Sequence, residues 1–423
     1  ASNSAAEARS LSAGRPQAPT AHLDVSDANS LGKLVREHDV VVSFVPATLH
    51  PVVAEHCINE KKHLVTASYL SPAMKAFDAR AKQHGLTFIN EIGLDPGIDH
   101  LTAMRAFDEV KEKGGKITSF ISWCGGLPAP EASNNPLGYK FSWSPRGVLL
   151  AGLNSAVFKR DGKIQTIEGK DLMRSAVGVP IYPGFALEGI PNRDSLGYLE
   201  TYGLGDGSSL QNMFRGTLRY RGYTEMMGAF VELGLLDTAI RADIKTGMSW
   251  ADLMTSTLGL TSIPQSETGW RDAVFKKLRP YPTADATGRL DRVMASLNWS
   301  MLSKDHAVAP SPSILDAFCA LLQSKLVYAE GERDLVVMHH VFGVEWANGR
   351  SNEMTSTLIA YGDPNGYSAM AKTVGLPAAM ATEMILDGTM RHTGVLAPVY
   401  KDIYEPMLEK LEGEGIKFVE ETR

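Results

Sequence analysis

Two groups of polar side chains in this chain have the types and spacing that ligand chemistry needs. The first centres on the carboxylate of Asp95, in the segment EIGLDPGIDH, where Gly93, Pro96 and Gly97 shape a tight turn directly after an apolar run. Open α/β sheets place their ligand chemistry in such loops, beyond the carboxyl end of a strand. A turn in which Asp95 only caps the backbone is the structural alternative.

The second group lies in the segment FRGTLRYRGY. In a strand, Arg215, Thr217, Arg219 and Arg221 would share one face. Like charges on one face repel each other unless an anion neutralises them, and guanidinium forks bind carboxylates in two-point contacts. Arg193, in the loop PNRDS, is a further candidate. The pattern favours a carboxylate-bearing ligand, although solvent exposure or salt bridges within the protein would explain it equally well.

The elements that must position Asp95 alternate between strands and helices. Residues 39–45 form a near-continuous apolar run, typical of a parallel strand buried on both faces, and residues 64–68 predict the next strand. A short strand is expected at 20–24, followed by a helix that begins near Asp27. Ser71 and Pro72 form an N-cap with proline at the first helical position, and the helix should end near Gly85.

This order of elements predicts βαβ units and a parallel sheet with right-handed crossovers. Polar residues follow successive strands: Ser43, then Ser68 and Tyr69, then Asp95. The carboxyl ends of parallel strands meet at one edge of the sheet, where a nucleotide would lie. Simple loop capping would also place polar residues at these positions.

The remainder of the chain changes pattern twice. Alternating residues predict strands near 117–123 and at 139–144, and Asn348-Gly349 predicts a hairpin between 334–346 and 351–361. Residues 224–326 are helical in period, and 366–388 form a helix rich in small residues that is suited to close packing on a sheet.

Composition excludes several classes of protein. The 423 residues carry a formal net charge of -6, so there is no basic footprint for nucleic acid. No apolar stretch approaches membrane-spanning length, and no signal-peptide core opens the chain. The three cysteines form no CxxC motif, which favours a reducing, cytoplasmic location. The histidines show no trusted metal-ligand spacing, and we expect His100 to be a core or helix-end histidine.

Long motifs in this chain resemble one family. The segments SFVPATLHPVV, VTASYLSPAM, NEIGLDPGIDH, CGGLPAPEASNNPLGYKFSWSPRGVL, PNRDS, RGTLRYRG and YSAMAKTVGLP are similar to those of glutamate-forming saccharopine dehydrogenases, also called saccharopine reductases. The resemblance covers essentially the whole chain and is somewhat closer to the free-standing fungal form than to the animal form. It implies a reversible reaction in which glutamate and 2-aminoadipate 6-semialdehyde condense to an imine that NADPH reduces to saccharopine.

The resemblance also implies a domain layout. It comprises a Rossmann-type domain at 1–96, a mixed α/β domain for saccharopine binding and dimerisation at 97–223 and 327–365, a helical subdomain at 224–326, and a return to the Rossmann domain at 366–423. Because the chain opens in a helical pattern, we expect the first strand and the Gly-rich phosphate loop of the Rossmann domain to be missing. A homodimer is expected.

The family's functional residues transfer to this chain by motif. The cofactor contacts implied are Ser2, Asn3, Asp24, Val45, Ala67, Ser68, Leu94, Asp95, Pro96 and Ser144. The substrate contacts implied are Ser68, Tyr69, Asp95, Arg193, Thr217, Leu218 and Arg219, with Asp95 and Tyr69 as candidates for orienting the substrate amine or a catalytic water. Asn3 stands where NADP-using members often carry arginine, which leaves the choice of cofactor open. NADP is expected because the resemblance is closer to the fungal form, and NAD stays possible.

Two alternatives remain at the level of sequence. One is a related oxidoreductase acting on another amine–dicarboxylate. The other is a non-catalytic, nucleotide-sensing protein, which the missing phosphate loop would favour because backbone N–H groups at a helix N-terminus hold pyrophosphate.

Overall fold

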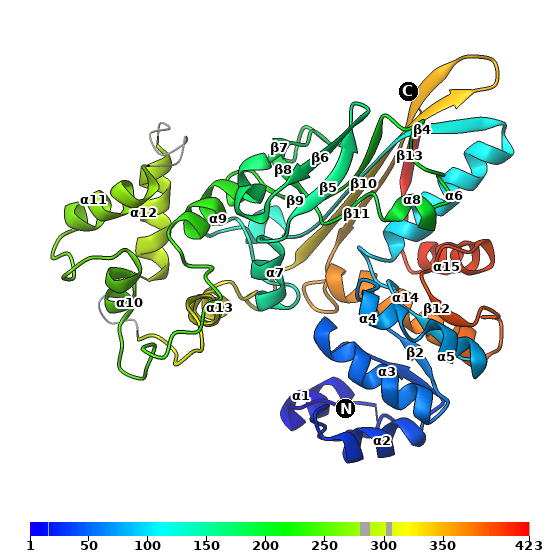
Figure 1. The fold of residues 1–423 in the computed structure, drawn as a ribbon, viewed down its shortest axis with the longest axis horizontal. Helices are drawn as coiled ribbons and strands as arrows, with labels where there is room; N and C mark the ends of the chain where they lie inside the picture. Colours follow the sequence, from blue (N-terminus) through cyan, green and yellow to red (C-terminus); the bar gives the residue numbers. More distant parts are fainter. Residues whose placement is uncertain (16, 280–287, 302–306, 423) are drawn as a thin grey trace. The chain divides into compact units, whose positions relative to one another are not determined.

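The structure is a computed structural model that describes residues 1–15, 17–279, 288–301 and 307–422. It divides into two compact units, of which unit 1 comprises Ala1–Glu112 and Ala371–Lys417, and unit 2 comprises Lys113–Met370 and Phe418–Arg423. Helices and strands alternate through residues 40–128 (Figure 1). The predicted α/β class, with a parallel sheet in the N-terminal part, is confirmed.

Unit 1 is built on a parallel sheet. Within the described residues it has four strands in the order β1-β2-β3-β12, namely β1 (Val40–Val42), β2 (His63–Val65), β3 (Thr87–Ile89) and β12 (Gly394–Leu396). The pairing β12–β3 joins residues far apart in sequence, with Val395 opposite Phe88. Phe88 and Leu64 are fully buried in the core between this sheet and its helices.

Two helices of unit 1 begin at the caps that the sequence predicts. Asp27 accepts hydrogen bonds from the backbone at the start of α2, and Ser71 caps α4 with Pro72 at the first position, both as predicted. Gly85 has a φ of 66°, as predicted for a helix stop, but the single helix predicted between Ser71 and Gly85 is divided by a turn at residues 76–77 into α4 and α5. The helices are α1 (Ala5–Ser12), α2 (Ala28–Arg36), η1 (Ala47–Leu49), α3 (His50–Asn59), α4 (Pro72–Lys75), α5 (Asp78–Gln83), α6 (Ile98–Glu112), α14 (Ala369–Leu386) and α15 (Lys401–Gly413).

Two strand predictions in unit 1 are wrong. The run at 39–45 is not buried on both faces, because β1 has a neighbour on one side only in the described sheet and Val42 and Phe44 are 40% and 60% exposed. Residues 20–24 form a single parallel bridge, Ser2 with His22, and no strand, because no longer ladder forms there. An apolar run indicates that part of a strand is buried. It does not indicate how many neighbouring strands the strand has.

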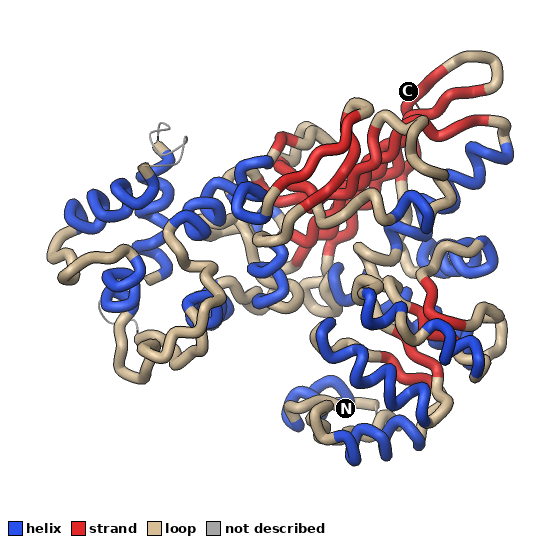
Figure 2. The backbone as a smooth tube through the Cα atoms, in the orientation of Figure 1, coloured by secondary structure: helices blue, strands red, loops and turns tan. Residues whose placement is uncertain are grey.

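Unit 2 is built on a larger mixed sheet, seen as the long strands of Figure 2. In the described part of the chain it has nine strands, with the path β13-β11-β10-β4-β9-β5-β6, and β8 pairs with both β7 and β9. The strands are β4 (Gly115–Pro128), β5 (Ala156–Arg160), β6 (Lys163–Ile167), β7 (Val177–Gly178), β8 (Leu187–Pro191), β9 (Asn212–Tyr220), β10 (Asp334–Trp346), β11 (Ser351–Tyr361) and β13 (Val419–Thr422). The predicted hairpin is β10–β11, with Gly349 at a φ of 77°.

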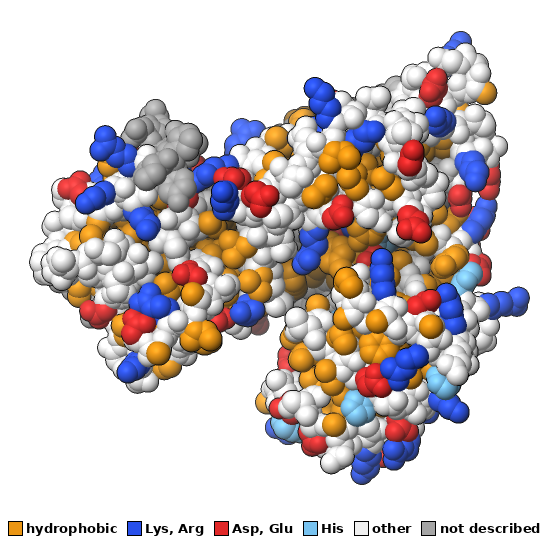
Figure 3. Space-filling model, in the orientation of Figure 1, with side chains coloured by type: hydrophobic (Ala, Val, Ile, Leu, Met, Phe, Trp, Pro, Cys, Tyr) orange, Lys and Arg blue, Asp and Glu red, His pale blue; other side chains and the backbone are white. Residues whose placement is uncertain are grey.

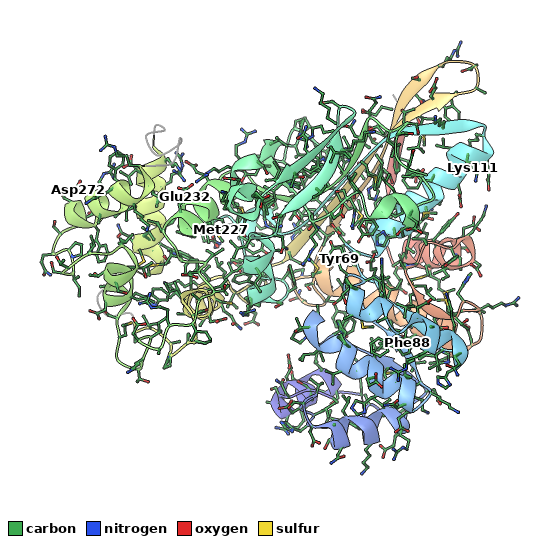
Figure 4. All side chains as sticks on the ribbon, in the orientation of Figure 1. Tyr69, Phe88, Lys111, Met227, Glu232 and Asp272 are labelled. Carbon is green, nitrogen blue, oxygen red and sulfur yellow. The ribbon has the colours of Figure 1, made fainter. Side chains whose placement is uncertain are left out.

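Most helices of unit 2 gather beyond one end of this sheet, while α8 lies at the other end (Figure 1). They are η2 (Pro130–Ala132), α7 (Pro145–Ala151), η3 (Gly169–Ser175), α8 (Tyr198–Thr201), α9 (Tyr223–Glu232), α10 (Trp250–Thr257), α11 (Glu267–Leu278), α12 (Arg289–Ser300) and α13 (Ile314–Lys325). The helical subdomain predicted at 224–326 contains α10–α13 and most of α9, and its residues 280–287 and 302–306 lie outside the described residues. Met227 and Glu232, labelled in Figure 4, are buried on α9.

The predicted strand at 139–144 is wrong. These residues form an irregular loop in which the Asn135 side chain bonds the backbone at Leu137 and Tyr139. Tyr139 is buried and Trp143 is 46% exposed, so the aromatic residues do not share one strand face. The backbone of Tyr139 is bonded to the Asn135 side chain, and the N–H of Phe141 donates to the carbonyl of Leu326, outside any strand pairing.

Two features of the structure can be compared with the composition: the distribution of charged side chains and the apolarity of the helices. Figure 3 shows acidic and basic side chains intermixed over α10–α12 on the face that is drawn. In the ranges that the structure describes, no helix has the length and apolarity needed to span a membrane.

Candidate functional site

The loop that carries Asp95 is tight because Gly97 has no side chain. Gly97 has a φ of 148°, and a Cβ atom there would lie 2.0 Å from the carbonyl oxygen of Gly93. The N–H of Gly93 donates to the carbonyl of Pro96 at 2.9 Å, and the Asp95–Pro96 peptide bond is cis. Asp95 is therefore held, half-buried, just beyond β3.

Asp95 is paired with Tyr69, which follows β2. The Tyr69 hydroxyl donates to Oδ1 of Asp95 at 2.9 Å, and both side chains are half-buried (Tyr69 is labelled in Figure 4). Two residues that the sequence singled out separately therefore lie in contact. A carboxylate next to a phenol can orient an amine or a water and can hold a proton during a reaction.

A buried histidine joins the ends of β1 and β2. Nδ1 of His50 lies 3.0 Å from Oγ of Ser43, and Nε2 lies 2.8 Å from Oγ of Ser68 and 3.0 Å from Oγ1 of Thr66. The Ser68 N–H also donates to Thr66 Oγ1 at 3.3 Å, which leaves the Thr66 hydroxyl hydrogen for the imidazole. The predicted ligand residue Ser68 is thus fixed in orientation by His50.

The imidazole of His50 is neutral near pH 7. Burial lowers the pKa of His50 from 6.5 to about 4, because desolvation disfavours the charged ring. Sequence reasoning missed this residue. The available signal was its position as the first residue of a helix that follows a strand and a proline turn, but nothing in the sequence indicates which hydroxyls it meets.

The other residues expected at the cofactor form two separate groups in unit 1. Val45 and Ala67 are half-buried at strand ends, and Leu94 and Pro96 are buried in the Asp95 loop. Ser2, Asn3 and Asp24 lie together elsewhere, because the Leu23 N–H donates to the Ser2 carbonyl at 2.9 Å and the bridge joins Ser2 to His22. Hydrogen bonds from Ser26 lower the pKa of the exposed Asp24.

In unit 2, β9 carries the predicted arginines. Arg219 is only 8% exposed, and its guanidinium carbon lies 4.8 Å from the ring centre of Tyr139 and 5.2 Å from that of Tyr223. Nη1 donates to the Leu218 carbonyl at 2.7 Å, whereas Nε has no hydrogen-bond partner. Among the described residues no carboxylate lies within salt-bridge distance of Arg219.

Glu188 lies opposite Arg219 on the neighbouring strand β8, but its carboxylate binds another residue. Glu188 pairs in register with Arg219, but its Oε1 accepts from the N–H and the hydroxyl of Thr224, at 2.7 and 2.8 Å. Two other buried polar atoms, Tyr139 Oη and Ser142 Oγ, have no partner among the described residues. Burial raises the pKa of Tyr139 to about 12, so its phenol stays protonated and able to donate.

The remaining residues of this group differ in environment. Arg215 is buried over the ring of Tyr198 at 4.2 Å, and Thr217 is half-buried on the same face of β9. Leu218 faces the opposite side and is fully buried, so only its backbone is left for a ligand. Arg193 is exposed in the loop after β8 with a φ of 53°.

Two further residues that the sequence predicted for the site, Arg221 and Ser144, also belong to unit 2. The expectation that Arg221 shares the strand face is wrong, since β9 ends at Tyr220 and Arg221 is exposed beyond it. Ser144 is exposed and caps α7 by accepting from the Gly147 N–H at 3.2 Å. Within the described part of the chain, no cluster of three or more His, Cys, Asp or Glu could hold a metal ion.

Comparisons with known proteins agree on one family. Residues 1–89 match the saccharopine dehydrogenase NADP binding domain, and residues 93–416 match the saccharopine dehydrogenase C-terminal domain. The chain is 43% identical over 408 residues to saccharopine dehydrogenase [NADP(+), L-glutamate-forming] of Pyricularia oryzae, covering 96% of this chain and 89% of that one. It is 42% identical to the mitochondrial alpha-aminoadipic semialdehyde synthase of Bos taurus, over 93% of this chain and 41% of that one.

A solved structure gives the same answer. Apo histidine-tagged saccharopine dehydrogenase (L-Glu forming) from Saccharomyces cerevisiae superposes with a TM-score of 0.86 at 41% identity, covering 100% of this chain and 93% of that one. The two domain matches together span nearly all of the sequence. The chain therefore belongs to the saccharopine dehydrogenase family.

Proposed function

We propose that this chain is an NADP-dependent oxidoreductase that interconverts saccharopine with L-glutamate and 2-aminoadipate 6-semialdehyde. In the forward direction the amine of glutamate condenses with the aldehyde, losing water, and the imine takes up a hydride and a proton. In the reverse direction the same steps release glutamate. The similarity to enzymes of that name over 96% of the chain supports this activity over a different amine–dicarboxylate oxidoreductase or a nucleotide sensor.

We assign the dinucleotide to unit 1 from the groups at the ends of its strands. Hydroxyls of Ser43 and Ser68 lie at the carboxyl ends of neighbouring parallel strands, and neutral His50 adds no charge beside them. Val45, Ala67, Ser68 and the loop of Asp95 would hold the cofactor at this edge of the sheet. When bound, NADP supplies or accepts the hydride.

The observation that carries the proposal is Arg219. A buried guanidinium that no carboxylate of the described chain neutralises is costly to keep, and its two flanking rings offset only part of that cost. An anionic ligand removes the cost by supplying the missing charge. Saccharopine has three carboxylates, and we assign one of them to Arg219, with Thr217 and Arg193 as further contacts.

The pair Tyr69–Asp95 is the candidate for handling the proton. In the proposed role it orients the substrate amine or the water that adds to the imine, and Asp95 holds the proton released. Asp95→Asn and Tyr69→Phe test this role, with folding checked by circular dichroism. Wild-type rates in both variants would remove it.

The activity itself has a direct test. Oxidation of NADPH should occur when L-glutamate and 2-aminoadipate semialdehyde are added together, and with neither alone. Oxidation that proceeds with the aldehyde alone would instead indicate a simple aldehyde reductase.

The Arg219 assignment makes a second, sharper prediction. Arg219→Gln should raise the KM for saccharopine about 10- to 100-fold through loss of a charge-assisted contact. The same variant should unfold at an unchanged or higher temperature without ligand, because an unneutralised buried charge is gone. The control is Arg221→Gln, which removes an exposed arginine two residues away. A lower melting temperature for Arg219→Gln with an unchanged KM would assign Arg219 to the fold.

We further propose a homodimer in the cytoplasm, on the resemblance described above. The three cysteines are buried free thiols, which suits a reducing compartment. Sedimentation velocity of the purified chain tests the assembly, and a single species with the mass of one chain would contradict it.

A further inference from the structure

A cluster of three buried ionisable side chains lies behind the Tyr69–Asp95 pair. Glu91, Asp99 and His100 are 4%, 1% and 0% exposed, respectively. Nε2 of His100 lies 2.8 Å from Oε2 of Glu91, and Nδ1 lies 3.8 Å from Oδ1 of Asp99. The 2.8 Å contact is a hydrogen bond between the imidazole and the Glu91 carboxyl group.

Glu91 fixes the segment that carries Tyr69 from both sides. Its backbone N–H donates to the carbonyl of Ser68 at 3.1 Å, and its Oε1 accepts from the N–H of Leu70 at 2.7 Å. Glu91 adopts a φ of 56°, an uncommon conformation for a residue with a side chain. The two bonds bracket Tyr69, so its backbone follows the position of Glu91.

Asp99 fixes the loop that carries Asp95. Its Oδ1 accepts from the N–H of Gly97 at 2.6 Å, and its backbone N–H donates to the carbonyl of Leu94 at 3.1 Å. The His100 N–H donates to the Gly97 carbonyl at 2.8 Å. The first turn of α6 is therefore hydrogen-bonded to the loop on both sides of Asp95, at Leu94 and at Gly97.

The ring of His100 is hydrogen-bonded to Glu91 and stands next to Asp99 on α6, where the 3.8 Å between Nδ1 and Oδ1 is a close electrostatic contact beyond hydrogen-bond length. Helix α6 needs Asp99 to satisfy the backbone at its start, but it does not need the bond from Glu91 to Leu70, which belongs to a different segment. The chain therefore holds an acid–imidazole–acid line whose two ends fix the two segments that bear the reacting pair. The 2.9 Å contact between the Tyr69 hydroxyl and Asp95 depends on both segments staying in register.

We propose that Glu91, His100 and Asp99 form a positioning triad that sets the Tyr69 hydroxyl against the Asp95 carboxylate. None of the three is assigned contact with substrate or cofactor, and they act through the backbone of residues 68–70 and 94–97. The expected effect on turnover rests on the proposed function, in which Tyr69 and Asp95 act on the substrate. The expected effect on the distance between Tyr69 and Asp95 does not depend on the proposed function.

The first experiment measures turnover in a double-mutant cycle. His100→Leu should lower kcat about 100-fold, since a displacement near 1 Å of a reacting group can cost that much. In a Tyr69→Phe background the same change should lower kcat less than about 3-fold, because the group being positioned is already gone. Equal losses in both backgrounds would overturn the proposal in favour of a general structural role.

Two conservative variants guard against a folding defect. His100→Gln places an amide nitrogen near the position of Nε2 and should restore most of the activity lost in His100→Leu. Glu91→Gln keeps the oxygen that accepts from Leu70 and replaces the oxygen that faces His100 with an amide nitrogen, so the loss of activity should be intermediate. A His100→Gln enzyme that folds with a wild-type melting temperature and is as slow as His100→Leu would contradict the proposal.

The second experiment does not depend on activity. Crystal structures of the ligand-free wild-type chain and the His100→Gln and His100→Leu variants give the distance from Tyr69 Oη to Asp95 Oδ1. We expect a hydrogen bond in the wild type and His100→Gln, and its loss in His100→Leu. An intact bond in His100→Leu overturns the triad even if the enzyme assay fails, whereas an inactive wild type with the expected geometry counts only against the proposed function.

Discussion

At the scale of single residues, the buried imidazole of His50 makes stability depend on pH. Burial lowers its pKa to about 4, so between this value and the ordinary 6.5 the unfolded chain binds a proton that the folded chain does not. The free energy of unfolding should therefore fall as pH decreases through this window, by roughly 3 kcal/mol in total.

His50→Gln removes the titrating group and keeps an amide that can bond Ser43 or Ser68. Its unfolding free energy, measured by urea denaturation from about pH 4 to 6.5, should be flatter than that of the wild type by the amount that His50 contributes. His84→Gln, at an exposed histidine, should keep the wild-type slope. Parallel curves for His50→Gln and the wild type would mean that His50 is not the group responsible.

Sequence reasoning reached some residues of the candidate site and missed others for a definite reason. Tyr69, Asp95 and Arg219 stand in motifs whose residue types suggest ligand chemistry. His50 and Glu91 act through contacts between segments that follow different strands, and no local pattern reports such contacts. The sequence also could not predict that Arg219 has no carboxylate partner among the described residues, because this depends on the Glu188 side chain bonding to Thr224 instead.

At the scale of elements, the start of α14 depends on one buried carboxylate. Asp334, the first residue of β10, is 1% exposed and accepts from the backbone N–H groups of Ala369 and Met370, at 2.6 and 2.9 Å. A negative charge at a helix N-terminus is favourable both as a cap and through the helix dipole.

Asp334→Asn keeps one accepting oxygen and loses the charge. We expect it to lower the free energy of unfolding by about 1 to 2 kcal/mol in urea denaturation. Asp363→Asn, at an exposed turn carboxylate nearby in the sequence, is the matched control and should change it by less than about 0.5 kcal/mol. Similar losses in both variants would exclude a special role for Asp334.

Elements were predictable where local chemistry alone determines them. The β10–β11 hairpin follows from Asn348-Gly349, and the starts of α2 and α4 follow from Asp27 and Ser71. The errors at 39–45 and 139–144 have a different origin, because the number of neighbours of a strand and the competition from Asn135 are set by distant or irregular parts of the chain.

At the scale of the whole molecule, the last residues of the chain cover a sheet edge. β13 pairs with β11 from Met354 to Thr357, and the ring of Phe418 stacks on His340 with centres 6.2 Å apart. An uncovered edge of a long strand is a template for pairing with other chains.

Removing residues 418–423 should therefore promote association. We expect the truncated protein to scatter more light on mild heating than the full chain at equal concentration. Phe418→Ala keeps β13 and removes only the ring stack, so it should stay dispersed. Aggregation of Phe418→Ala to the same extent as the truncated chain would attribute the effect to the ring and not to the edge.

The chain passes from unit 1 to unit 2 after Glu112, returns after Met370 and leaves again after Lys417. On the ribosome, β1, β2 and β3 emerge before unit 2, yet the outer edge of β3 meets its neighbour β12 only after all of residues 113–370 have been synthesised. The larger sheet of unit 2 can assemble most of its strands during this time. The parallel sheet of unit 1 still lacks β12. Chaperones that shield open strand edges should accordingly engage residues 40–89 of the growing polypeptide while residues 113–370 are translated.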